Sequence, residues 1–146
     1  MSKARPFSDL NIDYNDRSLT LGRKGSASFR EVKFFPVEFN ILLELLRYQG
    51  ELCSPDELNA YIPRPKEKVQ KGKPLPVLRR HISRIRQKLD QLFEGEELAL
   101  YMHAHYGGQF SLDAVHTQDP KNCQRFKLDQ EIVLLKSAPH AVLRYL

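Results

Sequence analysis

One stretch, residues 75–92 (LPVLRRHISRIRQKLDQL), constrains the fold more than any other part of this 146-residue chain. Its apolar residues recur at alternating spacings of four and three: Leu78, Ile82, Ile85, Leu89 and Leu92. This spacing predicts a single apolar stripe along an α-helix that packs on the rest of the domain. Pro76 suits the first turn of such a helix, where the missing N–H has no partner to lose. The chain must therefore bury one face of this helix.

The other faces of the same helix are almost purely cationic. Arg80, Arg84 and Gln87 fall opposite the apolar stripe; Arg79, Ser83 and Arg86 fall along one edge, and His81 and Lys88 along the other. An ordinary solvated helix would mix acids among these bases and form ion pairs one turn apart. No acid occurs between Leu75 and Lys88. The pattern favours DNA binding over a merely solvated face.

The positive charge is local to one segment. From Arg64 to Lys88 the chain carries ten Lys or Arg and one acid, which leaves 13 bases and 17 acids for all other residues. A local basic segment indicates a polyanionic partner. No apolar run approaches the roughly 20 residues of a membrane span, and no signal segment opens the chain. We expect a cytoplasmic protein whose two cysteines, Cys53 and Cys123, are free thiols.

The order of the expected elements defines an α+β fold. Alternating apolar residues predict three short strands in the first third of the chain, at 10–14, 19–21 and 27–34. A helix begins at Pro36 and stops near Gly50, and a capping box at Ser54 opens a short second helix through Ile62. A basic, proline-rich loop spans 63–76 before the arginine-rich helix. The segments 98–104 and 110–112 are predicted strands, joined by a hairpin turn at Tyr106-Gly107-Gly108-Gln109.

Three segments in this order, FPVEFNILLELLRYQGELCSPDEL, HISRIRQKL and YGGQFSL, resemble the winged helix-turn-helix of the OmpR/PhoB class, the output domain of bacterial response regulators. The resemblance covers about Leu10 to Leu112. It implies a small N-terminal antiparallel sheet, a three-helix core and a C-terminal β-hairpin wing. We therefore expect a winged-helix domain at 1–112, without a receiver domain before it, and a C-terminal extension at 113–146 of unassigned structure.

The resemblance also implies a function, sequence-specific binding of double-stranded DNA by a transcriptional regulator. Residues 75–92 would be the recognition helix in the major groove, and 98–112 the wing near the minor groove. The residues expected at DNA are Val77, Arg79, Arg80, His81, Ser83, Arg84, Arg86 and Lys88 of the helix, Lys71 and Lys73 of the loop, and His105 and Tyr106 of the wing. The loop lies where this family can contact RNA polymerase. Because one helix reads few base pairs, we also expect a homodimer or tandem binding.

Other functions are weaker. The runner-up is a protein-interaction module that uses the same surface for RNA polymerase or a partner regulator. RNA binding fits the charge but lacks stacking aromatics on the basic face. His103 and His105, with His116 and Cys123 downstream, could hold zinc, but no CxxC or HxxxH pair supports a tetrahedral site. No motif of a nucleophile, P-loop or metalloprotease occurs. We expect no enzyme activity, no cofactor and no metal.

Overall fold

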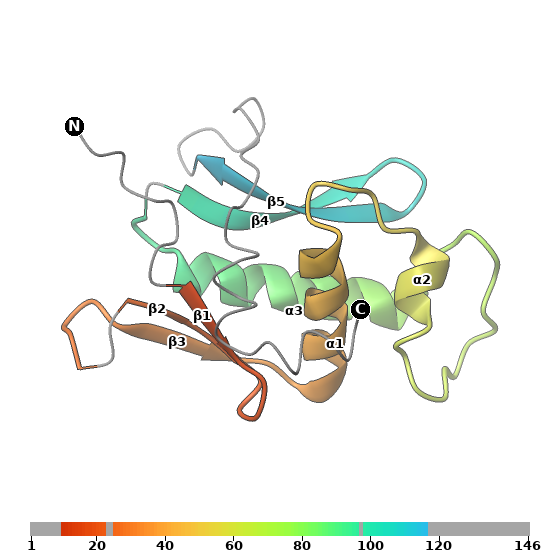
Figure 1. The fold of residues 1–146 in the computed structure, drawn as a ribbon. Coiled ribbons are helices and arrows are strands. Elements are labelled where there is room, and N and C mark those ends of the chain that lie inside the picture. Colours follow the sequence, from red (N-terminus) through yellow and green to blue (C-terminus); the bar gives the residue numbers. More distant parts are fainter. Residues whose placement is uncertain (1–9, 23–24, 97, 117–146) are drawn as a thin grey trace.

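The computed structural model describes residues 10–22, 25–96 and 98–116. Its elements in chain order are β1 (Leu10–Asp13), β2 (Ser18–Leu21), β3 (Arg30–Lys33), α1 (Pro36–Arg47), α2 (Pro55–Asn59), α3 (Pro76–Leu92), β4 (Leu98–His105) and β5 (Gln109–His116). In Figure 1, α3 runs between a three-stranded sheet on one side and the β4–β5 hairpin on the other, with α1 packed across it. The fold is thus a mixed one, with two small antiparallel sheets around a few helices, as the sequence predicted.

The N-terminal sheet has the order β1-β2-β3, and both pairs of strands are antiparallel. Leu10 lies opposite Leu21, and Ile12 opposite Leu19. All four of these side chains are buried, while the residues between them on β1 are exposed. The two-residue period therefore placed one face of the sheet on the core. The third strand is shorter than the predicted 27–34 and covers only Arg30–Lys33.

The first helix begins at Pro36, as the sequence predicted. Phe35 precedes it with extended backbone, and Pro36 occupies the first helical position. Glu38 Oε1 accepts a hydrogen bond from the backbone N–H of Phe35 at 3.1 Å, so this carboxylate satisfies a donor that the helix itself leaves free. The helix ends at Arg47, and Gly50 follows with a φ of +81°, a conformation that glycine adopts without strain.

The second helix is one turn shorter than expected. Ser54 Oγ accepts from the backbone N–H of Glu57 at 3.2 Å, which confirms the predicted N-terminal cap. The helix stops at Asn59, not at Ile62. The next amides, of Tyr61 and Ile62, bond to carbonyls three residues back, so the chain continues as a tighter turn before Pro63.

The third helix buries the predicted stripe: Leu78, Ile82, Ile85, Leu89 and Leu92 are each at most 3% exposed. The Arg30 guanidinium, reaching from β3, donates to the carbonyls of Leu92 and Glu94 at the end of this helix. A cation at this place satisfies carbonyls without a helical partner and complements the helix dipole. The N-terminal sheet is thus fixed to the C-terminal end of α3.

The β4–β5 hairpin pairs from Leu98 with His116 to His105 with Gln109. Its turn is Tyr106–Gly108, where the sequence predicted it. The second strand continues to His116, past residue 112, where the sequence placed the end of the domain. The remainder of the expected extension, 117–146, lies outside the described residues.

The connection between α1 and α2 forms an isolated β-bridge with the hairpin. Cys53 exchanges two backbone hydrogen bonds with Phe110, at 2.7 and 3.1 Å, and the N–H of Gly50 donates to the carbonyl of Leu112. Cys53 is a buried free thiol, as expected for one of the two cysteines. Burial raises its pKa to about 12, and Glu57, Glu44 and Glu51 add to that shift.

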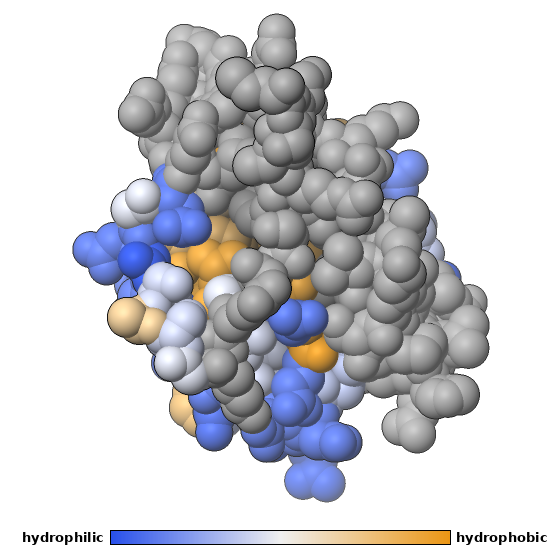
Figure 2. Space-filling model, turned by 60° about the vertical axis from the view of Figure 1, so that its left-hand side comes forward, coloured by the Kyte–Doolittle hydropathy of each residue, from blue (hydrophilic) through white to orange (hydrophobic). Residues whose placement is uncertain are grey.

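Two further observations concern the hydropathy of the described residues. In the view of Figure 2, the coloured residues are mostly hydrophilic, and small apolar areas lie among them. No helix within the described ranges has the length and apolar character that a membrane crossing requires.

Candidate nucleic-acid interface

The exposed face of α3 carries the cations that the sequence placed there. Arg79, Arg80, Ser83, Arg84 and Gln87 are all exposed. The side chains of the three arginines make no hydrogen bond or ion pair with any described residue. Since the opposite face of the helix is core, these guanidinium groups are held on a rigid support with their donors unused. This is the arrangement that an anionic partner requires.

Lys88 was expected at DNA, but the structure gives it a partner inside the protein. Its Nζ lies 2.6 Å from Glu38 Oε1, and Glu38 is completely buried. The same ammonium lies 4.7 Å from the centre of the Phe35 ring and 5.3 Å from that of Phe34. A carboxylate without contact with water needs a counter-charge. The charge of Lys88 therefore links α3 to the start of α1.

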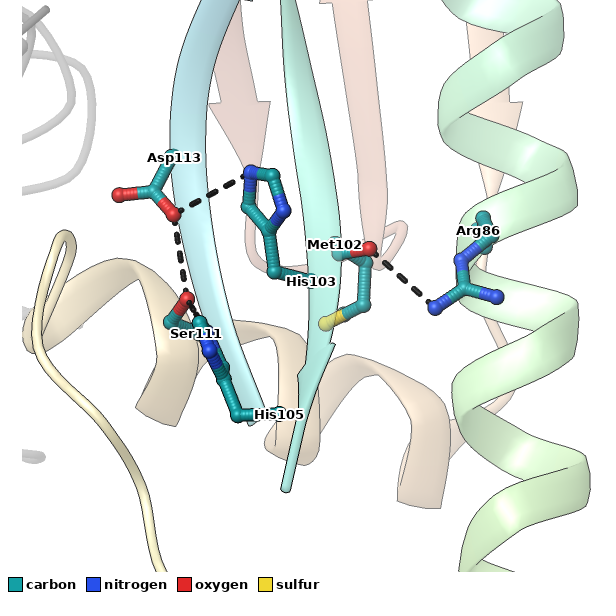
Figure 3. A network of polar contacts seen from close by, with 6 residues as sticks. All are labelled: Arg86, Met102, His103, His105, Ser111 and Asp113. Carbon is teal, nitrogen blue, oxygen red and sulfur yellow. Dashed lines mark hydrogen bonds and ion pairs between the residues drawn. The ribbon is translucent and has the colours of Figure 1, made fainter. Parts of the chain in front are cut away.

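Arg86 also faces inward. Its guanidinium donates to the backbone carbonyl of Met102 at 3.2 Å, across the gap between α3 and the edge of β4 (Figure 3). Its side chain is half-buried. This contact gives the outer edge of the hairpin a partner and fixes the position of the hairpin relative to the helix.

His81 and Val77 are half-buried. Val77 packs on the hydrophobic core. The Nδ1 atom of His81 is buried and finds no hydrogen-bond partner. Burial lowers the pKa of His81, and the nearby Arg84 and Arg80 lower it further, while Glu38 acts in the opposite direction. These effects favour the neutral form of His81, which adds no positive charge to the face of α3.

The basic loop contributes Lys71 and Lys73, both exposed, on either side of Gly72. The backbone around them is held by two side chains of α2. Asp56 Oδ1 accepts from the N–H of Gly72 at 2.9 Å. Asn59 accepts from the N–H of Leu75 at 3.0 Å and donates to the carbonyl of Lys73 at 2.8 Å. Sequence reasoning missed both α2 side chains, because no local pattern marks a bond to a loop 14 or 16 residues away.

The hairpin carries its own polar network on one face (Figure 3). His105 Nε2 lies 2.7 Å from Ser111 Oγ, which donates to Asp113 Oδ2 at 3.1 Å. His103 Nε2 lies 3.5 Å from the same Asp113 oxygen. His105 thus has a partner within the hairpin, whereas Tyr106, at the turn, is fully exposed. In the part of the chain that the structure describes, no three His, Cys, Asp or Glu residues are grouped to hold a metal ion.

Comparison with solved structures found domains that are similar to this chain in fold. The chain matches the response regulator AdeR DNA-binding domain, solved in complex with an intercistronic region, with a TM-score of 0.53 and 14% identity over 75% of this chain and 99% of that one. The DNA-binding domain of E. coli CadC matches with a TM-score of 0.48 and 19% identity, over 70% of this chain and 85% of that one. The C-terminal domain of the nisin resistance regulator NsrR matches with a TM-score of 0.49 and 19% identity, over 75% and 96%.

At this identity the AdeR match establishes the fold alone. The described part of the chain has the fold of a response-regulator DNA-binding domain, and the resemblance found in the sequence is confirmed at that level. A scan of protein-family models found no match, and a search of curated proteins found none.

Proposed function

We propose that this protein is a transcriptional regulator that binds double-stranded DNA sequence-specifically. In this proposal α1, α2 and α3 form the core of a winged helix-turn-helix, α3 enters the major groove, and the β4–β5 hairpin is the wing near the minor groove. The observation that carries the proposal is the exposed face of α3, where Arg80 and Arg84 lie opposite a fully buried stripe and Arg79 lies beside them. The side chains of these arginines have no hydrogen-bond or ion-pair partner in the described part of the chain.

The spacing of these arginines suits a duplex. An α-helix fits the major groove of B-DNA, and residues four apart on it are separated by about 6 Å along the axis. Two base-pair steps rise about 7 Å along the axis of the duplex. Arg80 and Arg84 can therefore reach phosphates or base edges about two steps apart, in the bidentate geometry that guanidinium groups offer.

The internal contacts rank the expected DNA-binding residues. Arg79, Arg80, Ser83 and Arg84 form the centre of the proposed interface, and Lys71, Lys73 and Tyr106 its periphery. Lys88, Arg86 and His81 support the helix from within, through Glu38, Met102 and the core. A single helix reads too few base pairs for a search of a genome, so we propose binding as a dimer or as tandem copies on a repeated site.

Selection from a random pool of duplexes tests this function. We expect the full chain to enrich a repeated motif and to hold it in the presence of excess nonspecific duplex at physiological salt. Recovery of no motif, together with loss of binding to the competitor, would contradict sequence-specific recognition. A protein-interaction module would show no duplex preference under these conditions.

A further inference from the structure

The last residues of the basic loop, 70–75, are anchored from one side by α2. Asp56 and Asn59 lie three positions apart and so project from the same face of this short helix. Asp56 accepts from Gly72, and the Asn59 amide bonds to both Lys73 and Leu75. Asn59 is only 5% exposed, so its two bonds are shielded from water. The backbone on both sides of Lys73 is therefore fixed to α2.

The turn of the β4–β5 hairpin bounds the same segment from another side. A Cβ added at Gly108 would lie 2.7 Å from Cδ and 3.2 Å from Cγ of Pro74, and 3.8 Å from Cγ of Pro55. The hairpin turn thus lies against Pro74, the loop residue between Lys73 and Leu75, which are the two partners of Asn59. In Figure 1 the hairpin turn, the loop and α2 all lie at the end of the molecule where α3 begins.

The rest of the loop has no such support. Residues 64–69 form no hydrogen bond with the described chain, whereas 70–75 are tied by the three α2 bonds and by a turn from Lys73 N to Gln70 O. Lys66 and Lys68 carry the same charge as Lys71 and Lys73, and all four lysines are exposed. Only the second pair stands on a backbone that hydrogen bonds hold to α2 before a ligand arrives. Ordering beforehand lowers the entropic cost of binding.

We propose that Asn59 is a positioning residue for DNA phosphate binding. Through its bonds to Lys73 and Leu75, it holds Lys71 and Lys73 as a fixed phosphate-binding pair beside the start of α3. This inference rests on the proposed function and deepens it. Asn59 touches no DNA itself. It acts through the loop backbone, and Asp56 acts in the same way through Gly72.

The test is a double-mutant cycle on the full chain, in which the affinity for the selected duplex is measured over a range of salt concentrations. The pair Lys71→Ala/Lys73→Ala should weaken binding roughly tenfold near 0.1 M salt and flatten the log–log salt slope by about 1 to 2, since each phosphate contact contributes roughly 0.9. The matched pair Lys66→Ala/Lys68→Ala removes the same charge from the unsupported part of the loop. It should flatten the slope by clearly less.

Asn59→Ala should weaken binding roughly three- to tenfold and flatten the slope, although it removes no charge. Adding Lys71→Ala/Lys73→Ala to it should then cost much less than in the wild type. A merely structural effect of Asn59 would leave the salt slope unchanged, and the two sets of losses would multiply. That result would overturn the inference.

Asp56 offers a variant pair that does not depend on a buried side chain. Asp56→Asn and Asp56→Ala both remove the carboxylate charge, but only Asn keeps an acceptor for Gly72 N–H. We expect Asp56→Ala to bind the duplex more weakly than Asp56→Asn. Equal affinities of the two variants would count against the role of α2 in holding the loop backbone. Absence of duplex binding by the wild type would refute the proposed function and this inference together. Wild-type binding with independent Asn59 and lysine effects would refute the inference alone.

Discussion

The contact between the hairpin turn and Pro74 makes Gly108→Ala the most informative stability variant. Gly108 has a φ of +77°, and an L-residue in this region costs about 1–2 kcal/mol. The new Cβ would also lie 2.7 Å from Pro74 Cδ, against about 3.5–4.0 Å for an ordinary carbon contact. The ring cannot rotate away from the clash, because its φ is locked and its neighbours are bonded to Asn59. Overpacking of this kind costs about 1–3 kcal/mol.

We therefore expect Gly108→Ala to lower the free energy of unfolding by about 2–5 kcal/mol in total, by adding these two costs. Gly107→Ala is the matched control. Its φ of +86° imposes the same backbone strain, but nothing lies within 4 Å of its added Cβ, so about 1–2 kcal/mol is expected. Urea denaturation followed by circular dichroism measures both. Equal losses for the two variants would refute the contact with Pro74.

Two further predictions concern residues that the structure turns inward. Lys88→Ala leaves the buried Glu38 carboxylate without its counter-charge, so it should lower the free energy of unfolding by about 3 kcal/mol, as measured by urea denaturation. The salt slope of DNA binding should stay unchanged. A flattened slope with normal stability would show that Lys88 contacts DNA instead. The pKa of His81 is lowered in the folded state, so the unfolded chain binds more protons at this residue. The contribution of His81 to the free energy of unfolding should therefore be fully present above the ordinary pKa of 6.5 and decrease as the pH drops below it. Melting temperatures of wild type and His81→Gln between pH 7.5 and 5 check this, and an identical decline in both would assign the loss to other groups.

Local patterns were enough to predict much of this fold. The four-three spacing from Leu78 to Leu92 requires only that one helical face meet the core, and every residue of the stripe is buried. The cap at Ser54 and the positive φ of Gly107 and Gly108 in the hairpin turn likewise depend on the chain within a few residues. These features follow from short-range geometry, which one sequence contains in full.

Partners distant in the sequence decide the roles of the side chains, and no periodicity encodes them. Lys88 and Arg84 are both cations on one helix, but Lys88 pairs with a glutamate 50 positions earlier. The Arg84 side chain has no hydrogen bond or ion pair within the described chain. Arg86 reaches a carbonyl 16 positions later, at the edge of a strand. For this reason the exposed cationic surface of α3 is narrower than the one predicted from the sequence. Its remaining members are Arg79, Arg80 and Arg84.

The most direct measurement of the central claim is the affinity of the Arg80→Ala/Arg84→Ala variant for the selected duplex. Both side chains are exposed and unpaired within the described residues, so each removal should change stability by less than about 0.5 kcal/mol. Ile82→Ala, on the opposite face of α3, is the contrasting control. It should destabilise the fold by about 2–5 kcal/mol through a core cavity and lose binding only as the protein unfolds.

We predict that the double variant, folded as judged by circular dichroism, loses about 1–3 kcal/mol of specific binding for each arginine and relaxes the preference for at least one base. A folded double variant that binds the selected duplex with wild-type affinity and wild-type preference would contradict the assignment of α3 as the recognition helix.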